Sequence, residues 1–231
     1  MNIGDPSLSG DTDYRDLFQD LAGRYPLITE TIDFGAISYF FTRVENPGEL
    51  PVDLVREGEL RWQPYWAEEW TSSRAICKLI SEGDFGECSI LDLGCGLGLA
   101  GTVAASRGSR VTFADNAEPA LEFSKINCWN WRANCRFEFI DWCQEQSTLE
   151  SFDIILGAEI IYDSADWDPL DDFWKKHLNR DGRVLLCDPF RDTGREFRNW
   201  IQNRQWSPVF SELLIPELEK PVNIMELKFA N

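Results

Sequence analysis

The feature that most constrains the fold is a short apolar segment that runs directly into a glycine-rich turn. Ser89 to Leu93 has the composition of a buried parallel strand, and Gly94-Cys95-Gly96-Leu97-Gly98 follows it. Glycine opens backbone dihedrals that are closed to other residues and has no Cβ to block a ligand. We therefore expect a nucleotide-like group to lie on this main chain, beside the amino end of a helix from about Leu99 to Arg107.

A second predicted strand, Arg110 to Asp115, follows that helix and ends in an acidic residue. The acid lies about 20 positions after the first glycine, where a carboxylate accepts hydrogen bonds from ribose hydroxyls. Strand, turn, helix, strand and terminal acid in this order predict an α/β domain that binds a nucleoside-containing cofactor.

The spacing of the glycines separates two classes of cofactor. Dinucleotide sites carry GxGxxG, whereas this turn is GxGxG and has Asp92 two residues before its first glycine. A carboxylate at the strand tip suits a cationic amino acid group better than a pyrophosphate. The segment from Leu91 to Gly98 resembles the first motif of the seven-stranded methyltransferases that use S-adenosylmethionine. This resemblance implies a Rossmann-like α/β fold: a seven-stranded, mostly parallel sheet, helices on both faces and an antiparallel last strand.

A second stretch narrows the resemblance. Pro64-Tyr65-Trp66-Ala67-Glu68-Glu69-Trp70-Thr71-Ser72-Ser73 resembles a segment of the protein lysine methyltransferase family that includes the enzyme for the electron transfer flavoprotein β subunit, with Thr71 in place of the usual proline. In that family the segment covers the cofactor, which implies a wall role for Trp66 and Trp70. Trp62, Trp66 and Trp70 also recur every four residues, so a helical packing stripe is the alternative to a loop.

Two further motifs follow at predicted strand ends. Asp141-Trp142 follows the strand Arg136 to Ile140, and the resemblance assigns the pair to adenine. Glu159-Ile160-Ile161-Tyr162 follows the strand Phe152 to Leu156 and resembles the family's [DE]xx[YF] motif, where the target lysine meets the methyl group. We expect Glu159 to orient the amine, and Tyr162 and Trp66 to wall its channel.

The predicted site residues fall into two groups. The catalytic pair is Glu159 and Tyr162. The cofactor-binding set is Trp66, Trp70, Asp92, Gly94, Cys95, Gly96, Gly98, Asp115, Asn116, Asp141, Trp142 and Ala158. Asp188-Pro189-Phe190-Arg191 resembles a DPxR segment of bacterial members, and its Asp188 and Arg191 line the substrate mouth or pair with each other.

The length suits one α/β domain with some extra N-terminal structure. The resemblance begins after residue 60, so we expect an extension over residues 1–60 and a methyltransferase domain over 61–231. We expect a disordered start to about Asp13, a short helix from Tyr14 to Tyr25, and a hairpin that includes a strand from Phe34 to Val44 and turns at Asn46-Pro47-Gly48. A monomer is the default expectation.

Composition excludes several functions. The net charge of −18 and the lack of a basic patch oppose nucleic-acid binding, and no apolar run approaches the ~20 residues of a membrane span. Because the N-terminus also lacks the basic and apolar regions of a secretory signal, the cytoplasm is the expected compartment. Seven cysteines without a CxxC pair argue against a disulfide framework and against a zinc site, so no metal is expected. His177 is expected at the surface.

The leading hypothesis is a protein-lysine N-methyltransferase. A small-molecule N- or O-methyltransferase on the same fold is the second hypothesis, with a small amine or metabolite as acceptor. A non-catalytic binding scaffold is the third. A nicotinamide-dependent oxidoreductase is more distant, because the GxGxG spacing and the lack of a suitable acid–base pair oppose it.

Overall fold

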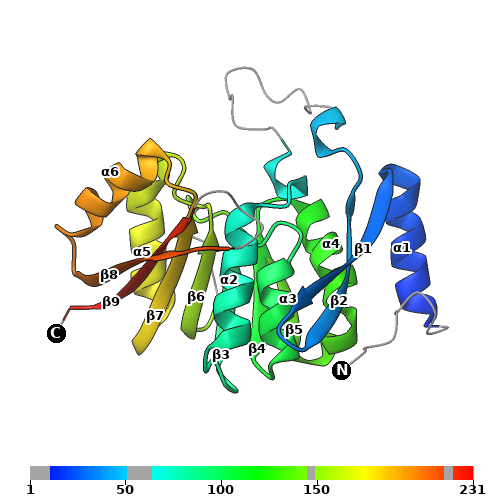
Figure 1. Ribbon diagram of the computed structural model, residues 1–231, viewed down its shortest axis with the longest axis horizontal. Helices are drawn as coiled ribbons and strands as arrows, with labels where there is room; N and C mark the ends of the chain where they lie inside the picture. Colours follow the sequence, from blue (N-terminus) through cyan, green and yellow to red (C-terminus); the bar gives the residue numbers. More distant parts are fainter. Residues whose placement is uncertain (1–10, 51–63, 145–148, 216–220, 231) are drawn as a thin grey trace.

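The chain folds around one seven-stranded mixed sheet with the order β5-β4-β3-β6-β7-β9-β8 (Figure 1). The computed structural model describes residues 11–50, 64–144, 149–215 and 221–230. The strands of this sheet are β3 (Ser89–Leu93), β4 (Arg110–Asp115), β5 (Cys135–Phe139), β6 (Phe152–Ala158), β7 (Leu178–Asp188), β8 (Trp206–Leu213) and β9 (Val222–Phe229).

Strand direction confirms the predicted fold class. The pairs on the β5 to β7 side of the sheet are parallel, whereas β9 runs antiparallel to both of its neighbours, β7 and β8. The last strand therefore opposes the others. The chain order along the sheet reverses between β3 and β6, and open α/β sheets bind ligands in the crevice at the carboxyl ends of strands at such a point.

Helices cover both faces of the sheet. They are α2 (Thr71–Glu82), α3 (Leu99–Ser106), α4 (Glu118–Asn127), α5 (Trp167–His177) and α6 (Asp192–Ile201). One buried cluster joins α2, α3 and α4 to the sheet, and a second joins α5 and α6 to it. Ile90 belongs to the first cluster, whereas Leu91 and Leu93 belong to the second. Burial on both faces explains why β3 is a nearly continuous apolar run.

The amino-terminal segment contributes a helix and a hairpin. Asp11 caps helix α1 (Thr12–Arg24), because its carboxylate accepts backbone N–H groups of the first turn. The predicted disorder to about Asp13 is therefore wrong from Asp11 onward. Strands β1 (Leu27–Phe34) and β2 (Ile37–Val44) pair antiparallel from Phe34 with Ile37 outward. The beginning of the predicted disordered stretch lies outside the described residues.

The hairpin turn is not where the sequence predicted it. The chain reverses at Gly35-Ala36, where Gly35 has a φ of 62°, because a tight hairpin turn needs a residue that accepts positive φ. Asn46-Pro47-Gly48 instead leads into a single 3-10 turn, η2 (Pro47–Glu49). Proline at the start of that turn has the φ that a helical turn requires.

Two irregular segments flank the parallel strands, and one expectation is corrected. Helix α4 stops at Asn127, and the 3-10 segment η4 (Trp129–Asn134) follows it. Asn179 to Gly182 belong to β7, where the register shifts against β6. His177 is buried at 2% exposure with its ring centroid 4.6 Å from that of Phe173, because α5 runs without a loop into a buried strand.

Candidate active site

A cavity of about 1140 Å³ lies at the carboxyl ends of the central parallel strands. The glycine turn, the ends of β4 and β6 and the loop before α2 all contribute to its wall. Most of the predicted site residues line it. They are Trp66, Trp70, Gly94, Cys95, Gly96, Asp115, Asn116, Asp141, Trp142, Ala158, Glu159 and Tyr162.

Asp92 and Gly98, the remaining two predicted residues, are not among the lining residues. The buried Asp92 carboxylate accepts the Gly101 N–H at 2.8 Å, so it stabilises the start of α3 from behind the turn. Gly98 has a φ of 75°, and a Cβ there would lie 2.5 Å from the Ser124 hydroxyl. Glycine is therefore required at position 98, both for the positive φ and for the close packing against α4.

Asp115 shapes the glycine turn as well as the cavity wall. Its two carboxylate oxygens accept the backbone N–H groups of Gly96 at 2.9 Å and Ala117 at 3.0 Å. Burial raises the pKa of Asp115 to about 6, against the lowering effect of these hydrogen bonds. Each oxygen keeps a lone pair for a further donor. Asp115 is therefore suited to accept hydroxyl donors from a ligand on the turn.

Gly96 brings its main chain close to the loop before α2. Its φ is 52°, and a Cβ there would lie 3.3 Å from the Trp66 carbonyl oxygen. A side chain at this position would strain the backbone and enter the cavity. The wall beside Gly96 is therefore bare main chain.

Asp141 and Trp142 form another part of the wall. The Asp141 carboxylate accepts the Cys143 N–H at 2.9 Å and the Gln144 side-chain amide at 2.8 Å. The Trp142 ring lies against Gly94, 3.6 Å from the position that a Cβ would occupy. The pair therefore offers a fixed carboxylate and an aromatic surface beside the turn.

The tryptophan-containing segment is a loop rather than a helical stripe. Only a 3-10 turn, η3 (Tyr65–Ala67), precedes α2 in its described part, and Trp62 lies outside the described residues. The Trp66 ring packs against Tyr25 and Phe123, with a centroid distance of 5.6 Å to each. Trp66 therefore shares in the core, whereas its backbone covers Gly96.

The aromatic wall near the predicted substrate site comes from Tyr65, Trp70 and Tyr162. The Tyr65 ring lies 6.0 Å from the Trp70 ring and 5.9 Å from that of Tyr162, centroid to centroid. Tyr65 was not in the predicted set, although it lies within the segment that resembles the family. Phe41 of β2 also lines the cavity, and nothing in its local sequence indicates this.

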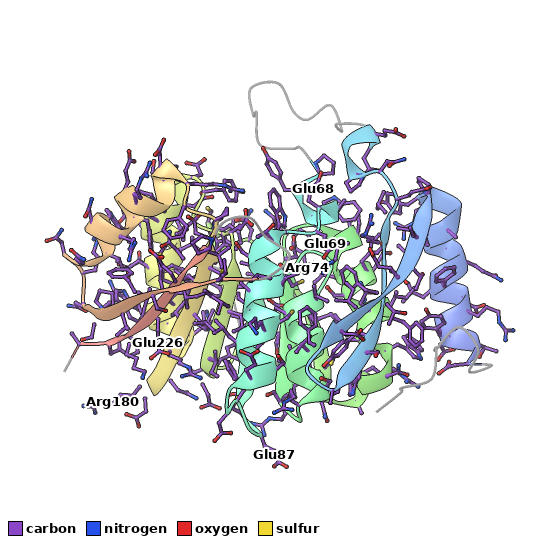
Figure 2. The ribbon with its side chains drawn as sticks, viewed as in Figure 1. Glu68, Glu69, Arg74, Glu87, Arg180 and Glu226 are labelled. Atoms are coloured by element: carbon purple, nitrogen blue, oxygen red, sulfur yellow. The ribbon has the colours of Figure 1, made fainter. Side chains whose placement is uncertain are left out.

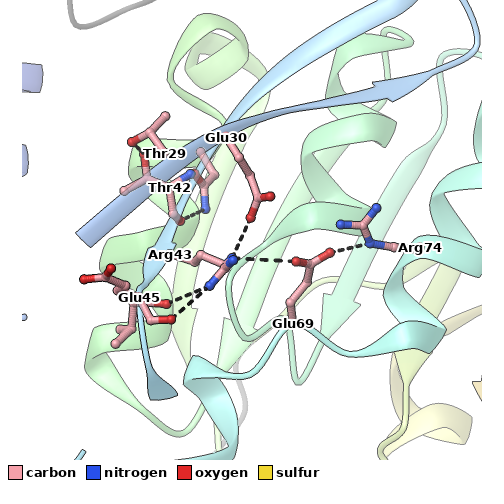
Figure 3. Close-up of polar contacts among 9 residues, drawn as sticks. Thr29, Glu30, Thr42, Arg43, Glu45, Glu69 and Arg74 are labelled. Carbon is pink, nitrogen blue, oxygen red and sulfur yellow. Dashed lines mark hydrogen bonds and ion pairs between the residues drawn. The ribbon is translucent and has the colours of Figure 1, made fainter. Parts of the chain in front are cut away.

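An ionic network holds this loop against the hairpin (Figure 3). Glu69 forms an ion pair with Arg74 of α2 and lies 3.8 Å from Arg43 of β2, measured from carboxylate oxygen to guanidinium nitrogen. Arg43 also pairs with Glu30 of β1 at 2.6 Å. Figure 2 shows that this end of the molecule, with Glu68, Glu69 and Arg74, lies opposite the end that holds Glu87, which precedes β3. The network therefore links three elements at the cavity end.

Glu159 lies at a strained backbone position next to the end of β6. Its φ is 60° and its side chain is 4% exposed. One carboxylate oxygen accepts the Ser72 N–H, in the first turn of α2, at 3.4 Å, and the other pairs with the Arg191 guanidinium. Burial raises the pKa of Glu159, against the lowering effects of Arg191 and Ser72.

The two residues of the DPxR segment that were singled out have different positions. Asp188 is buried and accepts the backbone N–H of Arg191 at 3.1 Å. The Arg191 side chain turns to Glu159 and lies over the Trp70 ring, 5.4 Å from its centroid, and it lines the cavity. Of the two predicted alternatives, lining the mouth or pairing with each other, the first therefore fits the Arg191 side chain.

Comparison with known proteins gives the family. Residues 65–203, more than half of the chain, match the family described as lysine methyltransferase. The chain belongs to this family. The predicted family is thereby confirmed.

The curated relatives carry lysine methyltransferase names. Protein N-lysine methyltransferase METTL21A of Xenopus tropicalis is 33% identical over 102 residues, which cover 40% of this chain and 46% of the relative. The electron transfer flavoprotein beta subunit lysine methyltransferase of Danio rerio is 29% identical over 133 residues, or 55% of this chain and 51% of the relative. The chain thus spans about half the length of the curated relatives it matches.

Solved structures show the same fold at low identity. The 1,6-didemethyltoxoflavin-N1-methyltransferase of Burkholderia thailandensis has a TM-score of 0.58 at 19% identity, over 72% of this chain and 81% of that one. The N-methyltransferase NodS of Bradyrhizobium japonicum has a TM-score of 0.56 at 18% identity, over 69% and 86%. Both of those structures contain S-adenosylhomocysteine.

The described residues contain neither a membrane span nor a cluster of metal ligands. None of the described helices is long and apolar enough to cross a membrane. Within the same residues, no group of histidine, cysteine and acidic side chains has the arrangement of a metal site.

Proposed function

We propose that this protein transfers a methyl group from S-adenosylmethionine to the side-chain amine of a lysine in a protein substrate. The observation that carries the proposal is the position of Glu159, whose buried carboxylate borders the same cavity as the bare glycine turn. A cofactor on the turn and an amine at Glu159 would therefore meet in the same cavity. The lysine acceptor is taken from the family and from the relatives' names.

The residues of the wall fit the cofactor. Gly96 leaves the main chain open where a Cβ would intrude, and Asp115 keeps acceptor lone pairs for ribose hydroxyls. Trp142 offers an aromatic surface and Asp141 a carboxylate for the adenine. When bound, S-adenosylmethionine would supply an electrophilic methyl group to the amine nitrogen and would keep the electron pair of the carbon–sulfur bond on its sulfur.

The chain's own residues would orient the amine and exclude water. Glu159 accepts a hydrogen bond from the amine and so directs its lone pair at the methyl group. Tyr65, Trp70 and Tyr162 wall the lysine side chain, and their apolar surface disfavours a charged amine. No covalent bond between protein and substrate is needed.

The compartment is part of the proposal. All of the cysteines, from Cys77 to Cys187, are free thiols in the structure. Free thiols persist in reducing compartments, so we place the protein in the cytoplasm.

The test is transfer of a labelled methyl group from S-adenosylmethionine into a lysate of the source organism, separated into protein and small-molecule fractions. We expect label in a discrete protein band and methyl-lysine after hydrolysis. Glu159→Gln should reduce transfer on the order of a hundredfold, because the amine loses its orientation. Glu87→Gln, an exposed change at the other end of the molecule, is the matched control (Figure 2).

The outcomes separate the possible acceptors. Label confined to small molecules would refute the lysine acceptor and favour a small-molecule methyltransferase. Gly96→Arg should abolish both labelling and cofactor binding, since its side chain would fill the cradle beside Trp66. Cofactor binding by the unaltered protein without any label would indicate a binding scaffold.

A further inference from the structure

The Glu159 carboxylate has two sources of positive charge as partners. One is the Arg191 guanidinium, and the other is the backbone N–H of Ser72 at the amino end of α2. A helix amino end carries partial positive charge, so both partners stabilise an ionised carboxylate. Glu159 therefore already has partners of positive charge before any acceptor enters.

The backbone holds this arrangement in place from both sides. Glu159 and Phe190 have φ values of 60° and 61°, and among the described residues they are the only non-glycine residues with positive φ. Phe190 directly precedes Arg191, whose N–H is bound by Asp188. Strained residues persist where the surrounding structure fixes them, often at functional sites. Both strained positions here support one ion pair.

This balance has a chemical consequence for a lysine acceptor. A lone buried carboxylate would attract the amine as an ammonium ion, which has no lone pair and cannot take a methyl group. A carboxylate already paired with a guanidinium gains little from a second cation, and Arg191 would repel it. The same carboxylate can still accept a hydrogen bond from a neutral amine.

We propose that Arg191 is a positioning residue that neutralises Glu159, so that the acceptor amine binds in its uncharged, nucleophilic form. The proton of the free ammonium ion leaves to solvent as the amine enters. This inference rests on the proposed function: it explains how the proposed active site selects the reactive, neutral form of the acceptor amine.

The other groups that face Glu159 do not replace Arg191. Asp188 of β7 adds negative charge, which Arg191 also has to offset. Burial raises the pKa of the Cys187 thiol to about 12, so it stays neutral at physiological pH. Ser72 contributes its N–H without titrating. Among these described neighbours, Arg191 is the cationic side chain.

The first test measures binding of n-butylamine, the end of a lysine side chain, with S-adenosylhomocysteine present and between pH 8 and 10. If the site takes only neutral amine, apparent affinity should rise about seventyfold over this range, because the ammonium pKa is about 10.4. In Arg191→Met the affinity should change less than about threefold, because the unpaired Glu159 now binds the ammonium form.

Two further variants control the charge and the fold. Arg191→Lys keeps the positive charge and should keep most of the pH dependence. Arg195→Met, on the exposed side of α6 where Arg195 pairs with Asp192, should behave like the unaltered protein. S-adenosylhomocysteine affinity verifies that each variant is folded.

Each outcome decides the inference. Equal pH dependence in the unaltered protein and in Arg191→Met would overturn it. Tighter butylamine binding by Arg191→Met with an unchanged pH dependence would also overturn it, and would show that Arg191 only occupies the amine position. Because butylamine binding requires no turnover, a failure to label lysine refutes the proposed function separately.

Discussion

At the scale of single residues, Asp92 shows how a motif residue can act through the backbone. Its carboxylate is buried and bound to the Gly101 N–H, and a Cβ on Gly101 would lie 2.8 Å from one of its oxygens. Burial, with a smaller contribution from Asp115, raises the pKa of Asp92 to about 7. The native fold therefore favours the protonated form of the Asp92 side chain.

This raised pKa predicts a pH dependence of stability. The native state of the free protein holds the Asp92 proton up to about pH 7, whereas the unfolded chain loses it near pH 3.8. The stabilising contribution is therefore complete below pH 3.8 and is lost as the pH rises to 7.

Asp92→Asn removes that titration and keeps an oxygen for the Gly101 N–H. Relative to the unaltered protein, its free energy of unfolding should rise by about 2 kcal/mol between pH 5 and pH 7. Urea unfolding at each pH measures the difference. Asp84→Asn, at an exposed position, is the control. Parallel curves for Asp92→Asn and the unaltered protein would contradict the argument.

At the scale of elements, the cavity depends on the loop between η3 and α2. Trp66 anchors this loop in the core, and Glu69 connects it to β2 and α2 through Arg43 and Arg74 (Figure 3). These ion pairs are partly exposed, so each adds little to global stability. Their effect should be on the position of the loop over the glycine turn.

Glu69→Gln tests this separation of stability and binding. It removes the charge that joins Arg43 to Arg74, so affinity for S-adenosylhomocysteine should fall several-fold, while the free energy of unfolding changes by less than about 1 kcal/mol. Calorimetric titration and urea unfolding measure the two quantities. Glu82→Gln removes a comparable ion pair with Lys78 away from the cavity and should leave affinity unchanged. A loss of stability without a loss of affinity would show that the network serves the fold alone.

At the scale of the whole molecule, the amino-terminal segment shares the core of the main sheet. Asn127 of α4 accepts the Thr42 N–H at 2.7 Å and donates to the carbonyl oxygens of Thr42 and Leu97 at 3.0 and 2.9 Å. Several apolar side chains of α1, β1 and β2 are buried in the same cluster as α2 and α3. They are Tyr14, Leu21, Ile32, Tyr39, Phe41 and Val44.

We infer that the predicted boundary at residue 60 marks where family motifs begin rather than where an independent domain begins. A chain shortened to residues 61–231 would expose to water the apolar surface of α2, α3 and α4 that these six side chains cover. We expect no cooperative urea transition from the shortened chain. Cooperative unfolding together with S-adenosylhomocysteine binding would show an independent domain.

The sequence by itself determined the sheet, the glycine turn and the family. Strand β4 lies where it was predicted, and β3 with its turn has the expected bounds, because apolar periodicity and glycine dihedrals act over a few neighbouring residues. Together with the resemblance to the family, strand ends also predicted that Asp115, Trp142 and Glu159 lie near one another, and all three line the cavity because parallel strands end at one edge of the sheet.

Only the tertiary structure decided which distant groups meet. The predicted site did not include Phe41, which reaches the cavity from the amino-terminal hairpin, and it did not show that Arg191 pairs with Glu159. His177 was expected at the surface, whereas α5 and β7 bury it. Such contacts depend on how elements far apart in the sequence pack, and burial then sets the charge balance of each group. The balance of charge at Glu159, on which the proposed selection of a neutral amine rests, is a property of the assembled fold.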